Sequence, residues 1–202
     1  MRVIGLTGGI GMGKSTAGAE FRRQRIPVFD ADAVVHRLQG PGGGALVPIA
    51  AAFPGVVADG VLDRARLRRA LTDPAALTRL ERIVHPLVRR AERAFLARAR
   101  ASRRAIAVLD VPLLFETGGD GRVDHVMVVS APATVQRARV VARGRMTSAQ
   151  VDAVIRRQLP DAERRRRADT VIRTGLSRFH AVAQIRRTLA RLRAANSHKH
   201  RA

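Results

Sequence analysis

The hydrophobic positions of this chain follow two patterns: short apolar runs, and longer stretches with apolar residues three or four positions apart. The short runs predict strands at residues 2–6, 28–30, 105–110, 123–130 and 170–172. Between them the wider spacing predicts helices. The run AIAVLD at 105–110 has no polar position before its last residue, which is typical of a strand buried on both faces of a parallel sheet. The alternation predicts an α/β fold with helices on both faces of a parallel sheet.

The longest helical stretch lies between the second and third predicted strands. Helices are expected at 15–25, 33–38, 46–53, from 63, from 74, and at 132–143, 148–158, 161–167 and 178–193. The insertion is long enough to form a substrate-binding subdomain. Within it, Pro86 follows His85 and predicts a kink or a break, because proline lacks the amide donor and clashes one turn back. The polar end of the chain, 196–202, is expected to fray.

A glycine-rich stretch between the first strand and the first helix indicates nucleotide binding. Residues 8–15, GGIGMGKS, fit the pattern G-x-x-x-x-G-K-[ST] in the strand-to-helix context that the pattern requires. Glycines let backbone N–H groups close around phosphates, and the helix N-terminus adds its positive end. Lys14 has a compact charge that suits the β- and γ-phosphates, and Ser15 offers a hydroxyl to Mg²⁺. The alternative is a flexible glycine turn whose lysine is incidental.

Acidic residues end two of the predicted strands, at the edge where open α/β sheets bind ligands. Asp30 and Asp32 follow the second strand, where a phosphate acceptor needs a group that orients its hydroxyl. One of the two can instead cap the helix that starts at Ala33. Asp110 ends the third strand and is the candidate second acid near Mg²⁺, with the capping of a turn as its alternative.

The charge balance of the chain is strongly positive. The sequence has 38 Lys and Arg against 16 Asp and Glu, a formal net charge of +22, and only Lys14 and Lys199 are lysines. This suggests an anionic partner: nucleic acid, an anionic membrane surface or a phosphorylated small molecule. The arginines are spread over many helices and Trp and Tyr are absent, which disfavours nucleic acid. A solvated arginine-rich surface explains the charge equally well.

Missing sequence features narrow the function classes further. The chain has no cysteine, which excludes disulfides, thiolate zinc sites and a nucleophilic thiol. No apolar run approaches the roughly 18 residues of a membrane span. Arg2 leads directly into the first strand with nothing like a signal peptide before it. We therefore expect a cytoplasmic protein that does not associate with membranes.

The motifs together resemble one enzyme family. The chain is similar to the dephospho-CoA kinases, P-loop kinases that resemble the nucleoside-monophosphate kinases. The matching stretches run from residue 2 to about 190 and are, in order, LTGGIGMGKST, VFDADAVVHRL, GVLDRARL, LERIVHPLV, VLDVPLLFETG, VDHVMVV, QRARVVAR and RQLPDAERRRRADTVI. The first stretch is shared by many families, whereas DAD followed by HP and PLLFE in this order is much more specific.

The resemblance implies a fold, a reaction and substrates. It implies one P-loop kinase domain over 1–195, with a nucleotide-binding core at about 1–40, 104–131 and 168–195. A helical CoA-binding insertion would occupy about 41–103, and a lid with its following helices about 132–167. The implied reaction is ATP-dependent phosphorylation of the ribose 3′-hydroxyl of dephospho-CoA, giving CoA and ADP. Mg²⁺ would accompany ATP, and the protein would be a monomer or a weak homo-oligomer that binds no nucleic acid.

The resemblance also implies roles for particular residues. The catalytic residues would be Asp32, Lys14 and Arg139, with Asp32 as general base. The ATP-binding residues would be Gly8, Gly11, Met12, Gly13, Lys14, Ser15, Thr16 and Arg143. The substrate-binding residues would be Asp32, Arg64, His85, Leu113 and Glu116, and the metal ligands Ser15 and Asp110.

Alternatives remain for some of these residues. His85 can be a core or hinge histidine beside its proline, and Leu113 can be ordinary core. Arg139 and Arg143, four apart on one predicted helix, can belong to a solvated face. The chain also departs from the family, with Gly144 and Arg145 where an acid often follows the lid arginine. Thr174-Gly175 stands where Asn-Gly is frequent near the adenine.

Two other functions fit part of the pattern. One is a P-loop kinase for another nucleotide or nucleoside, because the loop does not specify the acceptor. The other is a nucleic-acid-associated ATPase that uses the positive charge. Salt dependence separates such an ATPase from a kinase, because affinity that rests on many phosphate contacts falls by orders of magnitude as the salt concentration rises.

Overall fold

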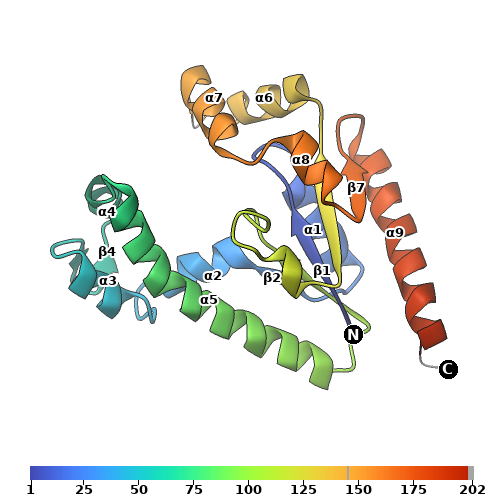
Figure 1. Ribbon diagram of the computed structural model, residues 1–202, viewed down its shortest axis with the longest axis horizontal. Coiled ribbons are helices and arrows are strands. Elements are labelled where there is room, and N and C mark those ends of the chain that lie inside the picture. Colours follow the sequence, from blue (N-terminus) through green and yellow to red (C-terminus); the bar gives the residue numbers. More distant parts are fainter. Residues whose placement is uncertain (145, 200–202) are drawn as a thin grey trace. The chain divides into compact units, whose positions relative to one another are not determined.

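The computed structural model describes residues 1–144 and 146–199 (Figure 1). The chain divides into two compact units. The first comprises residues 1–29 and the chain from residue 99 onward, and the second comprises residues 30–98. The second unit begins earlier than the insertion predicted at 41–103, and it includes the segment with Asp32.

A five-stranded sheet forms the centre of the first unit. Its strands, in spatial order, are β2 (Val28–Asp30), β5 (Ile106–Asp110), β1 (Arg2–Thr7), β6 (His125–Ser130) and β7 (Thr170–Arg173). The pairs β1–β5, β1–β6 and β6–β7 are parallel, so their carboxyl ends meet at one edge. All five residues of β5 are buried, as the continuous apolar run predicted. The predicted α/β fold with a parallel sheet is confirmed.

Side chains from alternate strand positions form two separate hydrophobic clusters. Met127 and Val129 pack with helices α1 (Lys14–Arg23) and α9 (Arg178–Lys199). Val126 and Val128 pack instead with Leu114 and Phe115, which follow β5. Because successive residues of a strand point to opposite faces, the sheet is covered on both sides.

The remaining helices of the first unit precede β7 in sequence. They are α6 (Ala133–Val141), α7 (Ser148–Arg157) and α8 (Asp161–Arg166), and a 3₁₀ turn covers Asp120–Arg122. Helix α9 continues to Lys199, past its predicted end at 193. Residues 200–202 lie outside the described residues.

The second unit is helical with its own hydrophobic core. Its elements are α2 (Ala31–Leu38), α3 (Leu46–Ala52), a hairpin of β3 (Val57–Ala58) and β4 (Val61–Leu62), α4 (Arg64–Ala70) and α5 (Pro74–Ala101). Buried side chains from α3, the hairpin, α4 and α5 form one cluster that includes Ile49, Leu62, Leu67 and Val84. This unit can therefore present side chains from several short elements on a packed base.

Of the kink or break predicted at Pro86, helix α5 excludes the break. It runs without interruption from Pro74 to Ala101, with Pro86 inside it. Pro86 is exposed, as is Arg82 one turn earlier, so the carbonyl that loses its helical donor can be hydrated. Val84 on the other side is buried in the core of the unit. Packing of that side holds the helix together across the proline.

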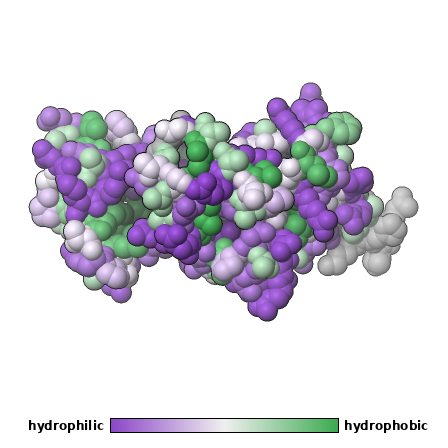
Figure 2. Space-filling view, turned by 90° about the horizontal axis from the view of Figure 1, so that it is seen from above, coloured by the Kyte–Doolittle hydropathy of each residue, from purple (hydrophilic) through white to green (hydrophobic). Residues whose placement is uncertain are grey.

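The surface matches the composition. Figure 2 shows mostly hydrophilic residues on one face, with smaller hydrophobic patches between them. Within the described part of the chain, no helix is both long enough and apolar enough to cross a membrane.

Candidate active site

The glycine-rich loop joins β1 to α1 and has a defined shape. Gly13 caps α1 with a left-handed backbone, φ +94°, which glycine adopts without strain. A Cβ at this position would lie 3.2–3.3 Å from the side chain of Thr174. Met12 is 2% exposed, and its sulfur accepts a hydrogen bond from the backbone of Ala131 at 3.0 Å. The Met12 side chain therefore packs the loop against the rest of the first unit.

The structure brings together two of the predicted site residues, Lys14 and Asp110. Lys14 Nζ lies 2.7 Å from Asp110 Oδ1, and the Asp110 side chain is 6% exposed. β1 and β5 are neighbours with Leu6 paired to Asp110, which places the acid beside the start of the loop. Ser15 is exposed at the first turn of α1. Asp110, predicted as the second acid near Mg²⁺, therefore lies beside the loop lysine, and its role toward a metal stays a prediction.

The donor set near the loop suits a hard cation. A hydroxyl from Ser15 and a carboxylate from Asp110 are oxygen ligands of the kind that Mg²⁺ takes alongside phosphates and water. Among the described residues, no group of three or more His, Cys, Asp or Glu side chains could hold a metal ion. A cation here would therefore depend on the nucleotide for most of its ligands.

The Arg139 side chain is bound to Thr174. Its Nη2 donates to the Thr174 carbonyl at 2.6 Å and its Nη1 donates to Thr174 Oγ1 at 3.2 Å. Thr174 Oγ1 in turn donates to the Met12 carbonyl at 2.7 Å. Thr174 therefore connects α6, the end of β7 and the P-loop. In the sequence it stood out only as a departure from the family, so its structural role was missed.

The prediction that Arg139 and Arg143 share a helix face is wrong. Helix α6 ends at Val141, so Arg143 lies beyond it in a turn and is exposed. Gly144 follows with φ +65°, a conformation that favours glycine and ends the helical turn. Arg145, the other departure from the family, lies outside the described residues.

A cavity of about 540 Å³ adjoins the loop in the first unit. Its lining includes Met12 from the loop, Pro132 and Gln136 from the start of α6, Arg165 from α8, and Gly175 after β7. This volume lies within the range of small-molecule sites, about 300–1,000 Å³. Apart from the Thr174-Gly175 pair, no sequence motif pointed to this cavity.

The structure shows which of the two acids at the end of β2 caps the helix that follows. Asp30 caps α2, its Oδ1 accepting from the backbone of Ala33 at 2.9 Å. The helix starts at Ala31, earlier than predicted, and Asp32 is its exposed second residue. The capping role therefore falls to Asp30.

Arg64 lies close to the helix that carries Asp32. Its Nη2 is 2.7 Å from His36 Nδ1. Asp32 and His36 are four residues apart on α2 and so share a face. Arg64 thus contacts His36, a residue on the same helix face as Asp32 that sequence reasoning did not single out.

The other predicted substrate residues are placed separately. His85 is exposed on α5 and lines a cavity of about 480 Å³ with Glu81, Arg82, Arg89 and Arg93, among others. In the first unit Leu113 is 45% exposed, which does not fit the alternative of an ordinary core residue.

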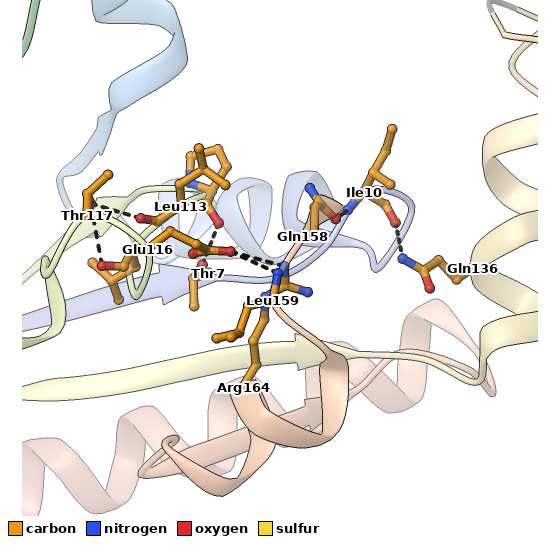
Figure 3. A network of polar contacts seen from close by, with 11 residues as sticks. Thr7, Ile10, Leu113, Glu116, Thr117, Gln136, Gln158, Leu159 and Arg164 are labelled. Carbon is orange, nitrogen blue, oxygen red and sulfur yellow. Dashed lines mark hydrogen bonds and ion pairs between the residues drawn. The ribbon is translucent and has the colours of Figure 1, made fainter. Parts of the chain in front are cut away.

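Glu116 has hydrogen-bond partners within the first unit (Figure 3). Its Oε1 accepts from the Leu159 backbone at 3.3 Å and from Arg164 Nη2 at 3.4 Å. Arg164 is 2% exposed, an unusual burial for arginine. Glu116 therefore holds the segment between α7 and α8 against the turn that follows β5.

Comparison with known proteins gives a consistent result. A family model described as dephospho-CoA kinase matches residues 2–177. The chain is 54% identical over 194 residues to the dephospho-CoA kinase of Mesorhizobium japonicum, covering 96% of this chain and 98% of that one. It is 53% identical over 201 residues to the dephospho-CoA kinase of Gluconobacter oxydans, covering 97% and 100%.

A solved structure has a similar fold and sequence. A protein from Thermus thermophilus, named TT1252, superposes with a TM-score of 0.82 at 37% identity, covering 95% of this chain and 97% of that one. With the P-loop, its lysine and the paired acid in place, and with relatives more than half identical over nearly the whole length, the chain belongs to the dephospho-CoA kinase family.

Proposed function

We propose that this chain transfers the γ-phosphoryl group of ATP to the ribose 3′-hydroxyl of dephospho-CoA, giving CoA and ADP, the last step of coenzyme A biosynthesis. The observation that carries this proposal is the family match from residue 2 to 177, which includes both the P-loop and the segment with Asp32. Members of this family are kinases that use ATP, and the Lys14–Asp110 pair fits that use.

The ATP phosphates would bind the P-loop through the backbone N–H groups of residues 11–16. Gly8, Gly11, Met12 and Gly13 shape the loop, while Lys14 places its charge on the β- and γ-phosphates. Lys14 already lies against Asp110, so its Nζ is held near the loop before the nucleotide arrives. Ser15, Thr16 and Asp110 complete the phosphate end of the site.

Mg²⁺ fits this end of the site, with Ser15 and Asp110 as its protein ligands. When bound with ATP it would neutralise the charge that develops on the phosphate oxygens. We expect the cavity beside Met12 and Gly175 to receive the adenine base, because it opens directly next to the loop.

Asp32 would act on the acceptor. Its carboxylate is exposed and does not cap α2, so it can accept the proton of the 3′-hydroxyl as that oxygen bonds to the γ-phosphorus. The electron pair of the broken P–O bond leaves with ADP. Arg64 on α4, whose Nη2 contacts His36 of α2, offers a cation to the anionic substrate. We assign His85, Leu113 and Glu116 to the same substrate.

The arginine-rich segment 132–167, which contains α6 to α8, is the candidate lid. Arg143 is exposed beyond α6 and can approach phosphates, whereas Arg139 is tied to Thr174 and would support the transition-state charge from that anchored position. Closure would exclude water, which would otherwise hydrolyse ATP. We assign the nucleotide core to the first unit, the helical CoA-binding insertion to the second, and the reaction to the cytoplasm.

Exchanging one acid at a time tests the role of Asp32. Asp32→Asn should lower kcat by about 10²–10⁴-fold while ATP still binds, because the amide cannot accept the proton. Asp30→Asn is the matched control: asparagine caps helices as well as aspartate, so this variant should retain most of the activity. The readouts are CoA and ADP formation by chromatography with mass detection, and ATP affinity by calorimetry. Equal activity losses in both variants would contradict the assignment.

A further inference from the structure

Two glutamines hold both polar backbone groups of Ile10, the residue just before the phosphate-binding residues 11–16 (Figure 3). The Ile10 N–H donates to Gln158 Oε1 at 3.0 Å. Gln136 Nε2 donates to the Ile10 carbonyl at 2.9 Å. A backbone N–H can only donate and a carbonyl can only accept, so the two amides are used in opposite senses. Gln158 serves as an acceptor and Gln136 as a donor.

The two glutamines come from the two ends of one segment. Gln136 lies in the first half of α6 and is 5% exposed, and Gln158 directly follows α7. The arginines at 139 and 143 lie in the chain between them. Both ends of this segment are therefore bonded to the same residue of the P-loop.

The outer side of the P-loop fits closely against these side chains. A Cβ at Gly9 would lie 2.9 Å from Arg164 Nη1, 3.1 Å from Gln158 Oε1 and 3.2 Å from Gln136 Nε2. A Cβ at this position would require these side-chain ends to shift, so glycine lets the loop approach them closely.

The Gln158 end is itself fixed from another element. Glu116, after β5, accepts hydrogen bonds from the backbone of Leu159 and from the buried Arg164. This contact joins the segment that carries Gln158 to the turn beside the sheet. Glu116 is thus linked to Ile10 through the adjacent residues Leu159 and Gln158.

We propose that Gln136 and Gln158 are positioning residues for ATP: they hold the P-loop in its nucleotide-binding shape and connect it to both ends of the segment 136–158. The inference rests on the proposed role of the P-loop as the ATP site. A loop ordered in advance loses less conformational freedom when phosphates bind. Loss of either hydrogen bond should therefore weaken the binding of ATP and leave the KM for dephospho-CoA nearly unchanged.

The opposite use of the two amides provides a matched test, Gln136→Glu against Gln158→Glu. Both changes add one negative charge near the loop, so any general electrostatic effect on ATP affinity should be the same in the two variants. Glutamate at 158 keeps an acceptor for the Ile10 N–H, and the KM for ATP should stay within about threefold of wild type. Glutamate at 136 loses the donor and faces the Ile10 carbonyl, and the KM for ATP should rise at least about tenfold.

Protonation and a neutral variant sharpen the test. The defect of Gln136→Glu, expressed relative to wild type, should shrink as the assay is made more acidic, because a protonated carboxyl can donate to the carbonyl. Gln136→Leu introduces an uncharged side chain of similar size, and it should weaken ATP binding at every pH. ATP affinity of the full chain is measured by calorimetry without acceptor, beside KM for each substrate, kcat and the melting temperature.

The outcomes separate the inference from the proposed function. Equal ATP defects in the two glutamate variants, or a parallel rise of both KM values, would overturn the positioning role. Wild-type protein that binds ATP no better than Lys14→Met would instead overturn the nucleotide site itself. A selective ATP defect in Gln136→Glu and Gln136→Leu, with Gln158→Glu near wild type, would support the inference.

Discussion

His125 shows how a single side chain responds to the fold. It starts β6, and its Nε2 lies 2.9 Å from Thr170 Oγ1 on β7. Burial lowers the pKa of His125 below its usual value; Asp169 opposes this shift, and Arg2 and Arg191 add to it. The folded protein therefore favours the neutral ring.

This shift predicts the direction of an acid effect on stability. The folded-state pKa lies below the unfolded value of about 6.5, so the unfolded chain binds more protons in acid. The contribution of His125 is complete above about pH 6.5 and is lost as the pH falls. We expect urea unfolding to show a smaller free energy at about pH 5.5 than at about pH 7.5, and His125→Gln to reduce that difference. An unchanged difference in the variant would contradict this account.

Positions of candidate site residues were predictable where a sequence motif allowed only one structural context. The P-loop pattern located Lys14, and the end of an apolar strand located Asp110, which the structure places 2.7 Å from it. The choice between Asp30 and Asp32 was not predictable, because both are good caps and the helix could begin on either side of Ala31. Thr174 was overlooked because its contacts with Met12 and Arg139 join segments far apart in sequence.

Helices α1 and α9 are joined through one buried acid. Glu20 on α1 is 4% exposed and accepts hydrogen bonds from Arg23, Gln24 and, at 2.9 Å, Arg186 of α9. Apolar side chains of both helices pack in the same cluster under the sheet. Glu20 therefore adds a directional, charged contact to a hydrophobic one.

Removing that charge should weaken the pairing of the two helices. Glu20→Gln should lower the free energy of unfolding by about 1–3 kcal/mol, since charge-assisted hydrogen bonds become neutral and one acceptor is lost. Glu163→Gln is the control, because its exposed pair with Arg166 should contribute about 0–1 kcal/mol. Urea denaturation measures both. A loss in Glu20→Gln no larger than in the control would show that apolar packing alone joins the helices.

The elements were predictable where their apolar pattern was long. All five strands of the sheet were located, and the helix ends shifted by only a few residues. Pro86 misled the prediction for α5 because tertiary packing of the buried side outweighs one missing hydrogen bond. The β3–β4 hairpin was missed because two-residue strands show no alternation. Its Asp59-Gly60 turn, with both φ values positive, is nevertheless a recognised hairpin signal.

On the scale of the whole molecule, the net charge of +22 is distributed over both units. Part of it has specific uses: Arg164 is buried against Glu116 and Arg139 is bonded to Thr174. Exposed arginines such as Arg143 and Arg64 remain available for an anionic substrate. Composition alone does not distinguish this use from nucleic-acid binding, whereas the order of the motifs along the chain favours the kinase.

The position of the transferred phosphate tests the central claim most directly. Purified protein would be incubated with ATP, Mg²⁺ and dephospho-CoA, and the product examined by phosphorus–proton correlation NMR. We predict a new phosphomonoester coupled to the ribose H3′, formed together with an equal amount of ADP. A phosphate on any other oxygen, or ATP consumed without a phosphorylated acceptor, would contradict the account.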